Sequence, residues 1–230
     1  MIKNFKHLLE LAKEKESNKI AVVAADDIEI LDVIAKAEEL NLADFILVGD
    51  AGKIRKIIEE RGINIKSEVV DEKDHKKAAD LAADLVEMGR AGALMKGMLH
   101  SSVFLKSILN KEKGLNTGKH ITQISILEKD NEDGLLFITD CAITVNPDLS
   151  EKKEVLENAV ELAHKLGNDQ PKVAILASLE VVNPDMQDTI DAAVLSKMAD
   201  RGQIKGCVVD GPFAFDNAVS VEAAKQKGII

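Results

Sequence analysis

The stretch KIAVVAADDIEILDVIAKAEELNLADFILVGD, residues 19 to 50, indicates the fold of the chain. It opens with an apolar run at 19–25 and closes with another at 44–50, and between them lies a charged segment of helical period. Continuous apolar runs are typical of strands buried on both faces, and a helix between two such strands makes them parallel. The stretch therefore predicts a strand, a helix and a second strand of one parallel sheet.

The same alternation continues beyond this stretch. Further helical and apolar segments follow at 51–62, 67–71, 71–89 and 91–97. Gly62 and Gly89 stand where two of the helices should end, and glycine is the usual residue at that position. Two runs at 119–128 and 134–142, joined by the polar turn DNED, predict a hairpin beside the parallel strands.

The chain after residue 146 restarts the alternation and contains all four prolines. The predicted fold class is therefore α/β, with two doubly wound domains, 1–146 and 147–230, a cleft between them and a hinge near 143–147. The last segment, AAKQKGII, resembles a helix end at Gly228 followed by the start of another strand. We expect the second domain to be incomplete at its C-terminal end.

The composition narrows the classes of partner. A net charge of −10 disfavours nucleic acid and anionic membranes, so an anionic substrate would need a local cationic pocket. The N-terminus lacks the apolar core of a signal peptide and no apolar run reaches about 18 residues, so we expect a cytoplasmic protein. Cys141 and Cys207 are interpreted as small buried side chains in a reducing compartment. The five histidines are scattered, which disfavours a metal site.

The segment after the predicted strand at 91–97 is the first candidate site. Ligands of open α/β sheets bind at the carboxyl ends of the strands. Lys96 supplies a positive charge, Gly97 permits close approach of the backbone, and Ser101 and Ser102 stand where a helix should begin. Together they suit a phosphate group. The alternative is a serine helix cap with solvated lysines, and His100 beside it suits either a surface residue or a catalyst.

Later strand ends carry further candidates. Asp140 ends the predicted strand beside the hinge, where an acid orients a ligand or caps a turn. The stretch VVDGPFAFDNAVS, 208–220, suggests a strand, a Gly-Pro turn and a helix start. Helix capping is the simple alternative for the acid and amide that follow this turn. The candidates near these ends are Asn183, Pro184, Asp210, Gly211, Pro212, Asp216 and Asn217.

Several common motifs are absent from the sequence. It has no G-x-G-x-x-G after the first strand, no G-x-x-x-x-G-K-[ST] and no G-x-S-x-G. These absences disfavour a Rossmann dinucleotide site, a nucleoside triphosphate loop and a serine hydrolase.

Three long stretches together resemble the phosphate acetyl/butyryl transferase family, closest to its butyryltransferase branch. They are ALMKGMLHSSVFLKSILNKEKGLNTG, FITDCAITVNPDLSEKKEVLENAVELAHKLG and the segment from PKVAILAS to KGI, and VVNPDM and RGQIKGCVVDGPFAFDNA are their most specific parts. The resemblance implies a fold like that of isocitrate and isopropylmalate dehydrogenases. It also implies exchange of a short acyl group between coenzyme A and inorganic phosphate, with coenzyme A as substrate and no tightly bound cofactor. A homodimer or larger homo-oligomer is implied as well.

The resemblance also bears on the candidate residues. It favours phosphate binding at the segment 96–102, and Lys106 matches an arginine of the acetyltransferase branch. The candidates from Asn183 to Asn217 would form the opposite wall of the predicted cleft, against the acyl chain or the pantetheine arm. Asn116 stands where arginine is common in the family. The expected base and a Ser-Arg motif would lie beyond Ile230, which leaves His100, Asp140 and Asp210 as catalytic candidates.

Two other functions remain open at this point. One is a two-domain protein that binds a small anion or coenzyme A without catalysis, and the other is a decarboxylating dehydrogenase of the related fold. A shared fold does not decide between such activities.

Overall fold

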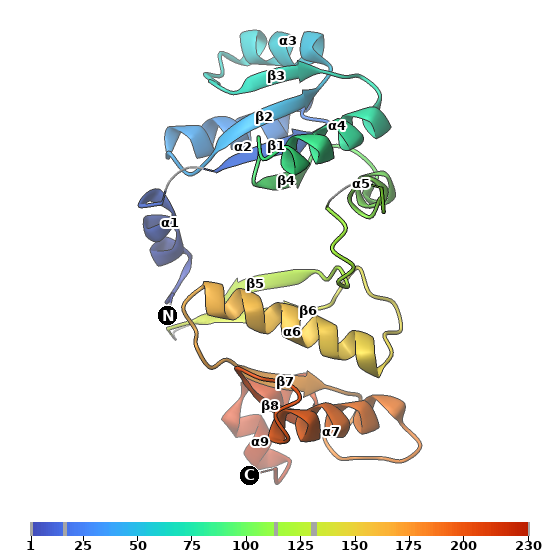
Figure 1. Cartoon of the computed structure of the whole chain (residues 1–230). Helices are drawn as coiled ribbons and strands as arrows, with labels where there is room; N and C mark the ends of the chain where they lie inside the picture. Colours follow the sequence, from blue (N-terminus) through green and yellow to red (C-terminus); the bar gives the residue numbers. More distant parts are fainter. Residues whose placement is uncertain (1, 16–17, 113–114, 130–132, 230) are drawn as a thin grey trace. The chain divides into compact units, whose positions relative to one another are not determined.

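The structure is a computed structural model that describes residues 2–15, 18–112, 115–129 and 133–229 (Figure 1). It divides into two compact units, Lys6–Gly118 and a second unit made of Met1–Phe5 with Lys119–Ile230. This division differs from the predicted one at residue 146, because the hairpin packs with the helix that follows it.

The unit Lys6–Gly118 contains a four-stranded parallel sheet. Its strand order is β3-β2-β1-β4. The strands are β1 (Lys19–Val23), β2 (Asp44–Gly49), β3 (Glu68–Asp71) and β4 (Ala93–Lys96). The helices are α1 (Phe5–Lys13), α2 (Ile28–Glu39), α3 (Ala51–Arg61), α4 (His75–Glu87) and α5 (Ser101–Ile108).

Helices cover both faces of this sheet, as the apolar runs predict. Val22 and Leu47 pack with buried residues of α2 and α3 on one face. Val23 and Val48 pack with the alanines of α4 and the apolar side of α5 on the other. Strands buried on both faces are typical of a doubly wound α/β fold, which confirms the predicted fold class.

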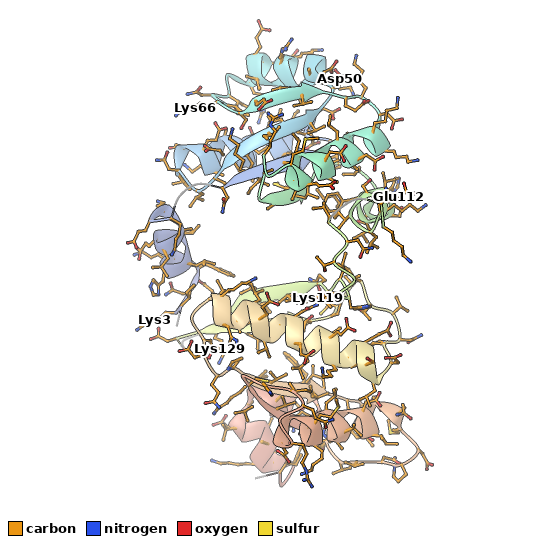
Figure 2. All side chains as sticks on the ribbon, in the orientation of Figure 1. Lys3, Asp50, Lys66, Glu112, Lys119 and Lys129 are labelled. Carbon is orange, nitrogen blue, oxygen red and sulfur yellow. The ribbon has the colours of Figure 1, made fainter. Side chains whose placement is uncertain are left out.

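Local polar residues set the ends of the helices. Asp27 accepts backbone hydrogen bonds at the start of α2, and Asp50, labelled in Figure 2, does so at the start of α3. Gly62 ends α3 in the left-handed region with φ 62°. A side-chain cap satisfies amides that the first turn of a helix leaves unpaired, so the sequence specifies these boundaries locally.

The second unit contains two small sheets among its described residues. Strands β5 (Ile124–Glu128) and β6 (Leu135–Thr139) form the predicted antiparallel hairpin, although residues 130–132 of its turn lie outside the described residues. Strands β7 (Lys172–Leu176) and β8 (Val208–Phe213) pair in parallel. The helices are α6 (Leu149–Lys165), α7 (Gln187–Asp200), α8 (Phe215–Val219) and α9 (Val221–Gln226). Residues of α6 and α7 share a core with β7 and β8.

Two predictions for the stretch 208–220 are wrong. Gly211 and Pro212 do not form a turn but lie inside β8, which continues to Phe213 because Ala177 N donates to the Phe213 carbonyl. The following helix begins at Phe215, and its N-cap is Ala214 without a side-chain hydrogen bond. Capping by Asp216 or Asn217 is therefore excluded, since both lie within α8.

The cysteines also differ from expectation. Cys141 is exposed and lies two residues beyond the end of β6. Cys207 is half-buried, and burial raises the pKa of its thiol.

Candidate functional site

The strand order of the first sheet places one candidate segment at its switch point. The chain leaves β1 toward β2 on one side, and β4 lies on the other side of β1. Ligands of open α/β sheets bind where the strand order reverses, at the carboxyl ends of the strands. Val23 at the end of β1 is paired with Lys96 at the end of β4. The predicted phosphate segment therefore begins at the switch point.

Gly97 brings the backbone of this segment close to the end of β1. Its amide donates to the Val23 carbonyl at 2.8 Å. A Cβ at this position would lie 2.4 Å from the Ala24 carbonyl oxygen and 2.5 Å from that of Val23. Both neighbours are backbone atoms, so only glycine fits without moving the strand.

Lys96 holds its ammonium group over the loop that follows. Its Nζ donates to the Leu99 carbonyl at 3.0 Å and lies 3.4 Å from that of Gly97. Within the described ranges it makes no salt bridge with an acid. An ammonium with three donors and no carboxylate partner can bind an anion.

The start of α5 adds unpaired backbone amides. The N-cap is His100, which makes no side-chain capping bond, so the predicted serine cap is wrong. Ser101 and Ser102 are instead the first two helical residues, both exposed, and their amides have no acceptor in the part of the chain that is described. Lys106 is exposed further along α5. Free amides at a helix start favour an anion.

A second group of predicted residues lies in the other unit, around β8. Asp210 does not end this strand but is paired with Ala174 inside it. Its Oδ1 accepts from the Gly211 amide at 2.8 Å and from Ser196 Oγ at 3.3 Å. A Cβ on Gly211 would lie 2.9 Å from Ile175. The side chain of Asp210 is thus bound by its own strand and by α7.

The residues of α8 differ strongly in their surroundings. Asp216 Oδ1 accepts from Lys227 Nζ at 2.8 Å, and this hydrogen bond lowers the pKa of Asp216. Lys227 also lies 3.7 Å from Glu180. Asn217 is buried, and neither polar atom of its side chain has a hydrogen-bond partner among the described residues.

Asn183 and Pro184 lie in the loop between β7 and α7 rather than at the helix start. Asn183 Oδ1 accepts from the Asp185 amide at 3.0 Å, and Thr189 Oγ1 accepts from the Asn183 amide at 2.9 Å. This loop is therefore held by its own hydrogen bonds, and Pro184 is exposed on it.

Asp140 is fully engaged as a hydrogen-bond acceptor. Its Oδ1 accepts from the amides of Ala142 and Ile143, and its Oδ2 from the Gln123 amide and Thr144 Oγ1, all between 2.8 and 3.0 Å. Partial burial raises the pKa of Asp140, but the four hydrogen bonds outweigh it and hold the pKa at about 2. The carboxylate therefore organises a turn, which is the simpler of its two predicted roles.

The two predicted groups thus differ in what they offer. Lys96, Gly97 and the start of α5 present charge and free donors at a switch point. The β8 group presents acids that are already paired and one buried amide without a partner. The two groups belong to different units.

Comparison with known sequences assigns the chain to a family. The model of the family described as "Phosphate acetyl/butaryl transferase" matches residues 71–229, which include every candidate residue above. The chain belongs to this family.

Individual members of the phosphate acetyl/butaryl transferase family are similar over the whole chain. A phosphate butyryltransferase of Clostridium acetobutylicum is 46% identical and one of Clostridium beijerinckii 47% identical, in each case over 100% of this chain and 76% of the relative. A solved structure, the branched-chain phosphotransacylase of Enterococcus faecalis, superposes with a TM-score of 0.77 at 27% identity. The superposition covers 93% of this chain and 74% of the Enterococcus faecalis chain.

Sequence reasoning missed several interactions in this transferase. Thr144 Oγ1 donates to Asp140, so its 2.9 Å contact with His120 requires a hydrogen on His120 Nε2. Lys227 pairs with two acids from separate segments. Neither set has a sequence signal, because His120 is 24 residues from Thr144 and Lys227 is far along the chain from Glu180, so that these partners meet only on folding.

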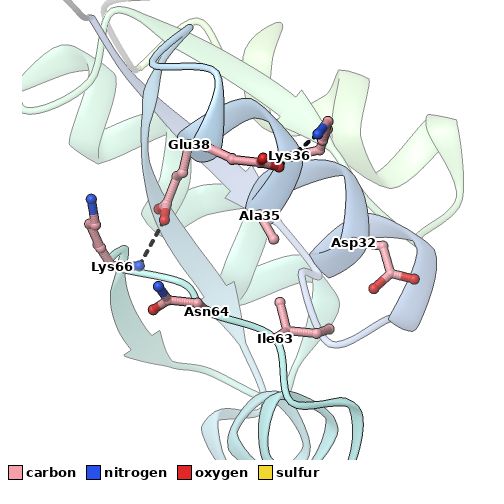
Figure 3. Close-up of a pocket in the computed structure, with 8 residues that line it drawn as sticks. Asp32, Ala35, Lys36, Glu38, Ile63, Asn64 and Lys66 are labelled. Atoms are coloured by element: carbon pink, nitrogen blue, oxygen red, sulfur yellow. Dashed lines mark hydrogen bonds and ion pairs between the residues drawn. The ribbon is translucent and has the colours of Figure 1, made fainter.

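The transferase also has a hollow away from the switch point. It has a volume of ≈ 480 Å³ and lies between α2 and the segment before β3 (Figure 3). Glu38 accepts from the Lys66 amide at 2.8 Å and Lys36 pairs with Glu39 at 2.7 Å. This hollow is at the amino ends of β2 and β3, opposite to the edge where ligands of such sheets bind.

A second hollow, of ≈ 540 Å³, lies at the starts of α6 and α7. The ion pair between Lys152 and the buried Asp191, 2.6 Å long, occupies it. Asp148, the other charged residue of its lining, accepts from the Glu151 amide as the cap of α6, so the charged side chains of this hollow already have partners.

Two further observations concern the described ranges as a whole. No group of three or more His, Cys, Asp or Glu side chains in them is arranged to hold a metal ion. No helix in them combines the length and the apolar character needed to cross a membrane.

Proposed function

We propose that this chain exchanges a short acyl group between coenzyme A and inorganic phosphate. Family membership, and the phosphate butyryltransferase names of its relatives, support this activity. Butyryl, acetyl and branched short chains are the acyl groups that these names suggest. We further propose a cytoplasmic homo-oligomer that uses coenzyme A as a substrate, with no tightly bound cofactor and no nucleic-acid or membrane partner.

The reaction needs no nucleophile from the protein. A phosphate oxygen attacks the thioester carbonyl, a C–O bond forms, the C–S bond breaks, and the coenzyme A thiolate takes up a proton. In reverse, the thiol loses its proton and attacks the acyl phosphate. The protein must position both substrates and stabilise the oxyanion that forms between them.

The observation that carries the proposal is the combination of the Lys96 charge with the free amides of Ser101 and Ser102 at the β1–β4 switch point. Lys96 and the amides of Ser101 and Ser102 would bind the phosphate oxygens, and Gly97 would allow the backbone to come close. Lys106 is a weaker contributor further along α5. Phosphate is recognised by this combination of charge and helix-start amides.

The residues around β8 and α8 would contact the acyl-CoA. The predicted set is Asn183, Pro184, Gly211, Pro212, Asp216 and Asn217. Among the catalytic candidates, Asp140 is a poor base because its pKa is about 2 and both oxygens are occupied. His100 and Asp210 remain as proposed proton acceptors, and both are exposed.

Replacing Lys96 by alanine tests the phosphate site. We expect the KM for phosphate in acyl-CoA cleavage, followed by release of the free thiol, to rise about tenfold or more, since one charge-assisted contact is lost. The KM for acyl-CoA should change little. Lys36→Ala is the matched control, because Lys36 is an exposed lysine of the same unit that pairs with Glu39. An unchanged phosphate KM in Lys96→Ala would remove Lys96 from the site.

A further inference from the structure

Asn217, in the second unit, has an unusual environment for a polar side chain. It is 7% exposed, and neither Oδ1 nor Nδ2 has a partner in the described part of the chain. Buried polar groups are almost always hydrogen-bonded, because desolvation without a partner is costly. The folded chain therefore buries a polar side chain without compensating hydrogen bonds, which is unfavourable.

Other asparagines of the unit show the normal arrangement. Asn158 Nδ2 donates to the His120 carbonyl at 2.9 Å and lies 3.3 Å from Thr122 Oγ1. Asn183 Oδ1 accepts from the Asp185 amide. Among the described residues, Asn217 is thus the buried side chain whose polar atoms lack partners, which makes a structural explanation for its amide unsatisfactory.

The helix that carries Asn217 is short and weakly held. Helix α8 has five residues and gives way to α9 at Ser220, which caps α9. It contacts β7 and α9, and Lys227 ties Asp216 to Glu180. Partly exposed ion pairs contribute little to stability. Phe215 and Val219 of α8 are also exposed, so a displacement of α8 that uncovers the amide would lose little apolar burial.

The chemistry of a carboxamide indicates which group it would bind. Its Nδ2 donates and its Oδ1 accepts, so a secondary amide satisfies both atoms at once. The pantetheine arm of coenzyme A contains two secondary amides, which are neutral, whereas inorganic phosphate is an anion that a neutral carboxamide beside the Asp216 carboxylate would bind poorly. A pantetheine amide is therefore the better complement.

We propose that the Asn217 carboxamide binds a secondary amide of the pantetheine arm of coenzyme A when α8 is displaced. This inference rests on the proposed function, because it takes coenzyme A as the substrate. It assigns Asn217 to coenzyme A affinity and not to phosphate binding or to the chemical step.

Asn217→Leu tests the inference, because leucine is an apolar side chain of similar shape. Replacement of an unpaired buried amide by such a group is neutral or stabilising. We expect an unchanged or higher Tm, a Kd for coenzyme A that rises about tenfold by calorimetric titration, and an unchanged KM for phosphate. Asn217→Ala should weaken coenzyme A binding in the same way and serves if the leucine variant does not fold.

Asn158→Ala is the matched control, since it removes an amide that has partners. It should lower the Tm and leave the Kd for coenzyme A unchanged. An unchanged Kd in the Asn217 variants, or a wild-type chain that does not bind coenzyme A, overturns the inference. Wild-type binding that depends on Asn217 without acyl exchange supports it and refutes the proposed function instead.

Discussion

Gly97→Ala should destabilise the unit Lys6–Gly118 by about 3 kcal/mol or more and abolish phosphate-dependent activity. The added Cβ would lie 2.4 Å from the Ala24 carbonyl oxygen and 2.5 Å from that of Val23. Both atoms belong to the backbone at the end of β1, so the overlap cannot be relieved by a side-chain rotation. Insertion of atoms into a packed site typically costs 1–3 kcal/mol, and more where the backbone must shift.

Activity should be lost together with stability, because the close contact at Gly97 also fixes the position of the candidate site. The Gly97 amide donates to the Val23 carbonyl. Lys96, the residue before Gly97, is the partner of Val23 in the pairing of β4 with β1. Movement of this segment would displace Lys96 and the start of α5 together. Urea unfolding of the variant measures the stability, and thiol release from acyl-CoA measures the activity.

Gly92→Ala is the control for this substitution. Gly92 precedes the same strand, and a Cβ there would meet Asn18 at 3.6 Å, an ordinary contact distance. We expect a change below about 0.5 kcal/mol and full activity. Equal stability of the two variants would show that the close approach at Gly97 is not required.

The first unit was predictable because its signals are local. The apolar runs at 19–25 and 44–50 form β1 and β2 as predicted, and Gly62 ends α3. Each of these elements is specified by its own period or cap, and tertiary contacts do not overrule it. The same local pattern located Lys96 at a strand end.

The second unit was harder because long-range pairing decides its details. Gly211 and Pro212 have the composition of a turn, yet pairing with β7 extends β8 through them to Phe213. Proline is tolerated there because β8 has no second neighbour among the described residues that would need its missing amide hydrogen. Asn217 could not be identified as unpaired from sequence, since burial and partners appear only in the folded chain.

Asp140→Asn should lower the free energy of unfolding by about 1 kcal/mol near pH 7, and the difference from wild type should close in acid. The pKa of Asp140 is about 2 in the folded chain against an ordinary value of 3.8. One pKa unit corresponds to about 1.4 kcal/mol, and solvent screening of this partly exposed carboxyl group reduces the contribution of its ionised form to about 1 kcal/mol. Asparagine keeps one acceptor oxygen, but its NH₂ group would face hydrogen-bond donors such as the amide of Gln123 or of Ala142, with which it cannot bond.

The sign of the pH dependence follows from the lowered pKa. A carboxyl group that is more acidic in the folded state stabilises the fold above its unfolded pKa, near 4. As the pH falls from about 4 through about 2, the wild-type carboxylate takes up a proton and this contribution is lost. Urea unfolding of both proteins from pH 7 to pH 2 should therefore show two curves that converge in acid.

Asp210→Asn is the control for this prediction. At its exposed position, this variant should differ from wild type by less than about 0.5 kcal/mol. A gap between wild type and Asp140→Asn that stays constant down to pH 2 would contradict the structural role of this carboxylate, because a constant gap is independent of its ionisation.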